Sequence, residues 1–330
     1  MILKMILLGE LMTDKKLPND YLQYPHRSYG MDHDLYDWSM LTGRKKVTWP
    51  DGKKLALWIN VPIQFFPLNQ RGEPFKVPAG MTMPYPDLRH FSLRDYGNRV
   101  GVYRFLEAFD QYGIEPTFAI NSDVAARMPA LIDQIKQRSN DVICYGQNMD
   151  ALHHNSLTED QEREQIQQAL TQLSKAIDKP VKGWLSPAKN ESSNTLDLLN
   201  ELGIEFVCDW VNDELPYHMK TKNRHVKNNN SPITAMPLST ELDDYFIIQQ
   251  NFHSEQSWLE QVCDACDFLI EEASEQGGRM LSLNIHPWLM GQPHRIAYLE
   301  EALKHLSSKT EIWHAGANQI SAYWNDQLMN

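Results

Sequence analysis

A histidine that directly follows a long apolar run is the residue of this chain best placed to do chemistry. The run Met280–Ile285 is typical of a buried strand, and it ends at His286-Pro287. In α/β folds the carboxyl ends of the strands face the ligand crevice. The proline lacks a backbone donor and ends the strand, which helps to direct the imidazole into a site. His286 is therefore a candidate general base or acid, although the same pattern also fits a histidine that only caps a strand.

A carboxylate follows another predicted strand in the same way. Asp209 comes directly after the strand expected at 205–208, so its side chain should lie at the same edge as His286. We take Asp209 as the second catalytic candidate; the alternative is that it caps a turn.

Polar and aromatic side chains near the other strand ends are candidates for substrate binding. The amide and phenol groups among them are suited to donate hydrogen bonds to a carbonyl or a developing oxyanion. The candidates are Gln64, Arg94, Tyr145, Gln147, Asn148, Trp184, His253 and His294. Each also has a structural interpretation; Arg94 and Asp95, for example, could pair to order a loop that covers the site.

The elements that would position these residues alternate between short apolar runs and amphipathic stretches. This alternation predicts parallel strands with helices outside them, and the number of units favours a barrel over an open sheet. Strands are expected at 55–62, 116–121, 142–145, 181–185, 205–208, 280–285 and 311–314. Helices are expected at 98–112, after the capping box 158–161, and at 194–202, 258–273 and 319–327.

Composition limits the class of protein. The chain has 330 residues, of which 42% are hydrophobic and 22% charged, as in an ordinary globular protein. We expect an N-terminal arm at 1–34 and a single domain at 35–330. The formal charge of −12 argues against nucleic acid or an anionic membrane as the main partner. The first residues resemble no secretory signal and no stretch is long enough for a membrane span, so the cytoplasm is the expected location.

The four cysteines are too few for a disulfide scaffold at this length. Cys263 and Cys266 have the CxxC spacing of metal and redox sites, but they lie in a helical segment without a second pair. We interpret them as packing residues on a helix.

Five ordered motifs carry a family resemblance that spans about residues 25–325. The chain resembles the allantoinase-like branch of the polysaccharide deacetylase superfamily. The matching segments are HFSLRDYGNRVG at 90–101, YGIEPTFAIN at 112–121, GWLSP with NTLDLL at 183–187 and 194–199, CDWVNDELPY at 208–217, and HP with GQPHR at 286–287 and 291–295. The resemblance implies an incomplete seven-stranded (β/α) barrel of the polysaccharide deacetylase type. It also implies hydrolysis of carbon–nitrogen bonds other than peptide bonds, and oligomers are common in the branch.

The departures from that family concern its metal site. Metal-dependent members place an acid after the first strand and a spaced pair of histidines after a later one, a set that suits zinc. These positions fall here on Gln64, Tyr145 and Met149, and Trp184 replaces an arginine of the third motif. An amide, a phenol and a thioether are poor ligands for a divalent cation, so we expect no metal and no other cofactor.

Two functions of different classes remain open at this stage. In the first, the chain is a metal-independent hydrolase that opens a small cyclic amide, ureide or imide and forms a homo-oligomer. In the second, it is a catalytically degenerate barrel that binds a small ligand or a partner. An acid at position 64 would have favoured catalysis, and Gln64 stands there instead. Deacetylation of sugar polymers ranks third because it normally needs the metal.

Overall fold

The computed structural model describes residues 33–70, 88–138, 140–221 and 232–329. The chain divides into two units, Met1–Gly43 and Arg44–Asn330. In the first unit the described part contains the 3-10 helix η3 (Leu41–Gly43). The arm predicted at 1–34 lies almost wholly outside the described residues, so its structure stays a prediction.

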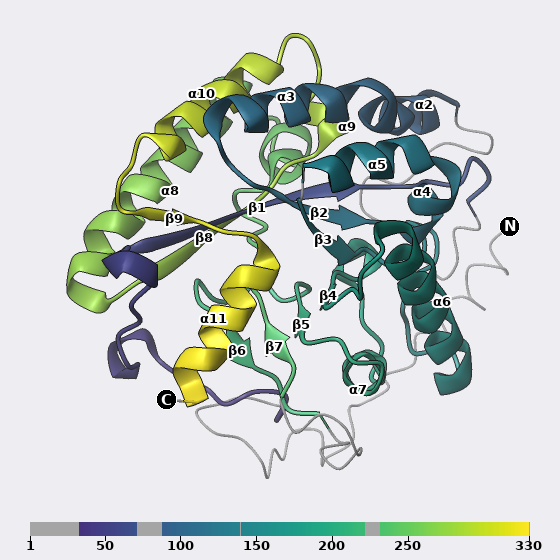
Figure 1. Ribbon diagram of the computed structural model, residues 1–330, viewed down its shortest axis with the longest axis horizontal. Coiled ribbons are helices and arrows are strands. Elements are labelled where there is room, and N and C mark those ends of the chain that lie inside the picture. Colours follow the sequence, from purple (N-terminus) through teal and green to yellow (C-terminus); the bar gives the residue numbers. More distant parts are fainter. Residues whose placement is uncertain (1–32, 71–87, 139, 222–231, 330) are drawn as a thin grey trace, which may run out of the picture. The chain divides into compact units, whose positions relative to one another are not determined.

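One curled, mostly parallel sheet forms the framework of the second unit (Figure 1). The strand order is β6-β7-β5-β4-β3-β2-β1-β8, with β9 also paired to β1. All pairs are parallel except β6 with β7. The strands are β1 (Leu55–Ile63), β2 (Thr117–Ile120), β3 (Asp141–Cys144), β4 (Gly183–Trp184), β5 (Phe206–Val207), β6 (Tyr217–His218), β7 (Thr234–Ala235), β8 (Arg279–Asn284) and β9 (Ile312–His314).

Helices follow most of the strands and lie around the outside of the curled sheet (Figure 1). They are α2 (Leu88–Tyr96), α3 (Val102–Tyr112), α4 (Ser122–Arg127), α5 (Pro129–Gln137), α6 (Glu159–Ile177), α7 (Thr195–Glu201), α8 (Glu255–Gln276), α9 (Pro287–Met290), α10 (Ile296–Ser307) and α11 (Ala317–Met329). Shorter turns are the 3-10 segments η4 (Pro50–Gly52) and η6 (Pro187–Lys189) and the π turns η5 (Gly97–Gly101) and η7 (Tyr245–Gln250). The predicted incomplete seven-stranded (β/α) barrel is confirmed.

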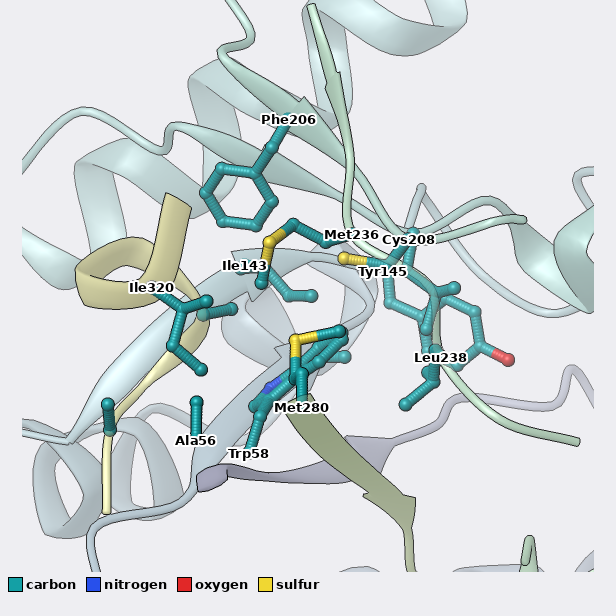
Figure 2. Close-up of a cluster of buried hydrophobic side chains, with 14 of the residues drawn as sticks. Ala56, Trp58, Ile143, Tyr145, Phe206, Cys208, Met236, Leu238, Met280 and Ile320 are labelled. Carbon is teal, nitrogen blue, oxygen red and sulfur yellow. The ribbon is translucent and has the colours of Figure 1, made fainter. Parts of the chain in front are cut away.

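The inner face of the sheet holds a core of side chains from many strands. Every residue of β1 and of β8 is buried, because both faces of these strands are covered, as is usual in parallel sheets. Trp58, Ile143 and Met280 belong to one buried cluster with Ile320 of α11 (Figure 2). Helix α11 therefore contributes to this core, in contrast to the helices outside the sheet.

Contacts of β8 with the segments around β6 and β7 bridge the open part of the barrel. The backbone N–H of Met280 donates to the carbonyl of Glu214 at 2.9 Å. The Ser239 N–H donates to the Ser282 hydroxyl at 2.9 Å. These bonds bring the end of β7 beside β8, the strand that carries His286.

The prediction that Arg94 and Asp95 lie in a loop is wrong. Both belong to α2, which continues through the π turn η5 into α3. We expected the helix to start at 98, and glycine at 97 would disfavour a helix that continues through it. Tyr96 nevertheless has helical backbone angles (φ −55, ψ −38), and the glycines are retained for a packing reason. The helices α4, α5 and α10 were not predicted either.

Glycines in two of the sequence motifs allow the backbone of η5 to touch the segment after His286. A Cβ built on Gly101 would lie 2.0 Å from the Pro287 carbonyl oxygen, and one on Gly97 would lie 2.8 Å from the Trp288 nitrogen. A Cβ on Gly291 would lie 2.5 Å from the Gly101 Cα. The RDYGNRVG motif and the His-Pro motif are thus two sides of one contact, which fixes the path of residues 287–291.

We predict that Gly101→Ala destabilises the protein. The new methyl group has no room, so the free energy of unfolding should fall by roughly 1–3 kcal/mol, as in other overpacked sites. Gly43→Ala is the control, because nothing lies within 4 Å of a Cβ at that position. Urea unfolding of the three proteins measures the difference. Equal stability of both variants would contradict this account of the contact.

No helix among the described residues combines the length and the apolar character needed to cross a membrane.

Candidate active site

A buried histidine–aspartate pair lies at the carboxyl end of β8. The Nδ1 atom of His286 is 2.6 Å from Oδ1 of Asp244, and the His286 backbone N–H donates to Oδ2 at 2.8 Å. The histidine is 6% exposed and Asp244 is fully buried. Two bonds to one carboxylate hold both the backbone and the ring of His286. Because Nδ1 faces Asp244, Nε2 is the ring nitrogen left for a ligand.

A second aspartate is held beside this pair by two asparagines. The Asn284 amide donates to Oδ2 of Asp243 at 2.6 Å, and the Asn60 amide donates to Oδ1 of Asn284 at 2.7 Å. Oδ1 of Asp243 lies 3.8 Å from Nδ1 of His286. Neighbouring strands β1 and β8 thus orient a carboxylate that adds a second negative charge near the imidazole.

These carboxylates change the proton affinity of His286. Burial alone would lower the pKa of His286, because it disfavours the charged ring. The charges of Asp244 and Asp243 outweigh burial, and the pKa is raised above its ordinary value of 6.5. The imidazolium form therefore persists to a higher pH than in a free histidine.

The residues that stand at the metal-ligand positions of the family bond to neighbouring protein groups instead. The Trp288 indole N–H donates to Oε1 of Gln64 at 3.3 Å, and the Asn98 amide donates to the Gln64 backbone carbonyl at 2.7 Å. The Gln64 side chain and the backbone N–H of Ala188 hydrogen-bond to the Tyr145 hydroxyl. Burial raises the pKa of Tyr145 well above its ordinary range, so the phenol stays neutral.

A metal ion does not fit these residues. Met149 is 1% exposed within the hydrophobic cluster that also contains Tyr145, and its backbone N–H bonds to Phe65. The Gln64 amide and the Tyr145 phenol are engaged with each other. Neutral oxygen and thioether donors without any anionic or imidazole ligand do not hold a divalent cation at useful affinity.

The adjacent histidines His153 and His154 offer no better metal site. His153 is buried with Nδ1 3.1 Å from Glu162, whereas Nδ1 of His154 accepts from the Ser156 N–H. The two adjacent histidines therefore serve separate structural contacts. One ligand atom each of Asp243, Asp244 and His286 lies within 4.8 Å of the others, but Nδ1 of His286 is already hydrogen-bonded to Asp244.

Asp209, the second predicted catalytic residue, is buried at the end of β5. Both of its oxygens accept from Ser186, from the N–H at 2.6 Å and from the hydroxyl at 2.7 Å. The Trp184 indole N–H donates to the same hydroxyl at 2.9 Å, so the predicted ligand-binding Trp184 is a fully buried support for Ser186. Glu191 hydrogen-bonds to Asp209, and burial beside this carboxylate raises the pKa of Glu191 well above its ordinary value. We conclude that the two carboxyl groups share a proton.

The structure brings some of the other predicted residues to the site and leaves others away from it. Arg94 is 7% exposed, with its guanidinium 5.1 Å from the ring centres of Phe66 and Trp288. It therefore covers the indole that orients Gln64, and its charge acts on His286.

Four further predicted residues lie outside this group or are exposed. The Asn148 amide donates to Asp123 at 2.8 Å, and the Gln147 carbonyl accepts from the Asp123 N–H. His253 is exposed before α8, and His294 is exposed with its charge near Glu255. A role of these residues in binding stays a prediction.

Four residues of the site were missed from the sequence. Asp243 and Asp244 follow the short strand β7, which was itself not predicted, and the consecutive acids after the apolar residues 233–238 were the available signal. Glu191 and Lys189 follow β4 in a polar stretch without periodicity. Nothing local distinguishes those two from surface residues.

We predict that Asp244→Asn lowers the pKa of His286. The amide removes the nearest negative charge and leaves the burial that opposes protonation, so the ring should titrate at a lower pH. An NMR titration of the His286 ring protons measures this. Asp267→Asn is the matched control, since Asp267 pairs with His305 at 3.0 Å on the surface and should leave His286 unchanged. An unaltered His286 titration in Asp244→Asn would contradict the proposed electrostatics.

Comparisons with known proteins show what this chain is similar to in sequence and in fold. Residues 94–207 match the family model described as polysaccharide deacetylase. A Schizosaccharomyces pombe protein provisionally named polysaccharide deacetylase is 22% identical over 299 residues, covering 84% of this chain and 92% of that protein.

Two solved structures share the fold. A provisionally named polysaccharide deacetylase from Pseudomonas aeruginosa PAO1 has a TM-score of 0.73 at 22% identity, covering 86% of this chain and 95% of that one. PuuE allantoinase has a TM-score of 0.75 at 23% identity, covering 86% and 94%. The segment that matches the family model, residues 94–207, contains the strands from β2 to β5 and the residues Arg94, Tyr145 and Trp184. Residues 94–207 are therefore similar to the polysaccharide deacetylase family, and the fold of the whole chain is similar to that of the two solved structures.

Proposed function

We propose that this protein hydrolyses a carbon–nitrogen bond of a small amide or ureide without a metal ion. The observation that carries the proposal is the imidazole of His286, held through Nδ1 by the buried Asp244. No hydrogen bond among the described residues takes up Nε2 of His286. An oriented imidazole with one free nitrogen is the arrangement that general acid–base catalysis uses.

The pair of His286 and Asp244 can move a proton in both steps of a hydrolysis, the attack of water and the departure of the nitrogen. The neutral Nε2 takes a proton from water as the water oxygen bonds to the carbonyl carbon, and the carbonyl electron pair moves onto its oxygen. The C–N bond then breaks, and the imidazolium returns the proton to the departing nitrogen. Asp244 stays ionised and stabilises the imidazolium in between.

The Tyr145 hydroxyl supplies a neutral donor where relatives would place a metal. It accepts from Gln64 and from the Ala188 N–H, so its own proton is left to be donated elsewhere. Trp288 engages Oε1 of Gln64 and thereby turns the amide nitrogen toward Tyr145. A donor oriented in advance stabilises a developing oxyanion more than a mobile one does.

The likeness to PuuE allantoinase supports a cyclic ureide or a related cyclic amide as the substrate class. Rings of this kind carry a carbonyl and a leaving nitrogen within one small molecule. The aromatic groups that surround His286 suit a flat ligand, since Tyr245 and Trp288 lie 6.2 Å and 5.6 Å from its ring centre.

The first test is a panel of allantoin, hydantoins, cyclic imides and acetylated amino sugars, assayed with and without a chelator. We expect hydrolysis of a cyclic amide or ureide at a rate that the chelator does not change. Loss of activity on chelation and recovery with zinc would overturn the metal-independent mechanism. If no compound is hydrolysed while a ring-shaped member of the panel raises the melting temperature, the protein is a binding module.

The second test removes the titrating group. We predict that His286→Asn folds normally and loses activity by about a hundredfold to ten-thousandfold, as expected for a missing general base. In the wild type the activity should fall as the pH drops through the raised pKa of His286, above the ordinary 6.5, because the neutral base disappears. His305→Asn, at a surface histidine paired with Asp267, should leave both rate and pH profile unchanged. A wild-type rate in His286→Asn would make this residue structural.

A further inference from the structure

A lysine after β4 has a backbone conformation that its residue type disfavours. Ala188 and Lys189 of the turn η6 have φ values of 60° and 54°. Residues with a Cβ rarely adopt this region, and here two of them do so in succession. Such conformations persist where the surrounding structure imposes them, and they cluster at functional sites.

The Lys189 side chain is held by neutral oxygens. Its ammonium donates to the Leu238 carbonyl at 2.7 Å and to the Thr240 hydroxyl at 3.3 Å. Within the described part of the chain, no carboxylate forms an ion pair with it. An ammonium has three donors, so one N–H remains for another acceptor. Lys189 is half-buried, and burial lowers its pKa despite the opposing charges of Asp243 and Asp209.

Lys189 lies in the same surroundings as the Tyr145 hydroxyl. The neighbouring Ala188 N–H bonds to that hydroxyl, and Leu238, whose carbonyl anchors the ammonium, belongs to the same buried cluster as Tyr145 (Figure 2). Asp209 and Asp243 act electrostatically on both Lys189 and Tyr145. The turn η6 thus carries the Ala188 N–H that bonds to the Tyr145 hydroxyl and, one residue later, the cation of Lys189.

We propose that the Lys189 ammonium binds the substrate's carbonyl oxygen and supplies the positive charge that stabilises the oxyanion. This inference rests on the proposed hydrolysis. As the water oxygen bonds to the carbonyl carbon, the carbonyl electron pair moves to oxygen, and the ammonium donates a hydrogen bond without giving up its proton. After the C–N bond breaks, the carboxylate product keeps the same contact. Lys189 is therefore a catalytic residue of the site.

Acetate is a suitable probe because it is the smallest carboxylate and needs no turnover. Calorimetric titration of the full chain should show saturable acetate binding. Lys189→Met keeps the length of the side chain without its charge and should bind at least about tenfold more weakly, the usual effect of losing a charged hydrogen bond. Lys189→Arg should retain most of the affinity. Lys182→Met, at a lysine 53% exposed and paired with Glu205, is the matched control.

The wild type offers a measurement that does not depend on a folded variant. Acetate should slow the acylation of Lys189 by a small amine-reactive reagent, and it should leave the acylation rate of Lys182 unchanged. Peptide mass spectrometry measures both rates. The proposal is overturned if acetate neither binds the wild type nor protects Lys189, or if Lys189→Met binds acetate like the wild type.

Kinetics separate this inference from the proposed function. With a hydrolysed substrate, Lys189→Met should lower kcat by on the order of a hundredfold with a smaller change in KM, since the contact strengthens in the transition state. A wild-type kcat in that variant, together with loss of activity in His286→Asn, would remove Lys189 from catalysis and leave the hydrolysis standing. Acetate binding through Lys189 without any hydrolysis would refute the proposed function but not the anion contact.

Discussion

The close approach of two backbone segments, possible only for glycine, supports the rest of the site. Gly97 and Gly101 lie against Pro287 and Trp288, where a Cβ would come within 3.0 Å of backbone atoms. The contact determines where the Trp288 indole reaches Gln64, and Asn98 from the same turn bonds to the Gln64 carbonyl. Gln64, which stands at a position where the family resemblance places a metal ligand, is thereby oriented from two sides by this contact.

Two buried ionisable side chains of this site, His286 and Asp209, are either paired with an opposite charge or hydrogen-bonded to a group that shares a proton with them. In a metal-dependent site the ion organises the carboxylate and imidazole ligands around itself. Here the imidazole of His286 is held by Asp244, and Asp209 is held by Ser186 and Glu191. Buried charges are costly unless they are hydrogen-bonded, so each replacement needs a partner on a neighbouring strand end.

Local patterns predicted much of the framework. The continuous apolar runs of β1 and β8 follow from burial on both faces, and the capping box at Thr158 and Gln161 starts α6 as expected. Short elements such as β7 and α4 were missed because a few residues carry too little periodicity to be recognised. The continuous helical path from α2 into α3 was missed for another reason. Gly97 and Gly101 disfavour an isolated helix, but their contact with residues 287–291, far away in the sequence, stabilises the helical path.

The sequence by itself determined the order of the longer strands and helices and placed His286, Asp209, Tyr145 and Gln64 at strand ends, because alternation and apolar run length are local properties. Only the tertiary structure decided which groups meet. Asp244 and His286 are 42 positions apart, and Ser186 and Asp209 are 23 apart. Such partners come together through the parallel pairing of strands and the curl of the sheet, and no local spacing encodes them. The same holds for Lys189, whose acceptors Leu238 and Thr240 follow β7 and whose conformation is imposed by the fold.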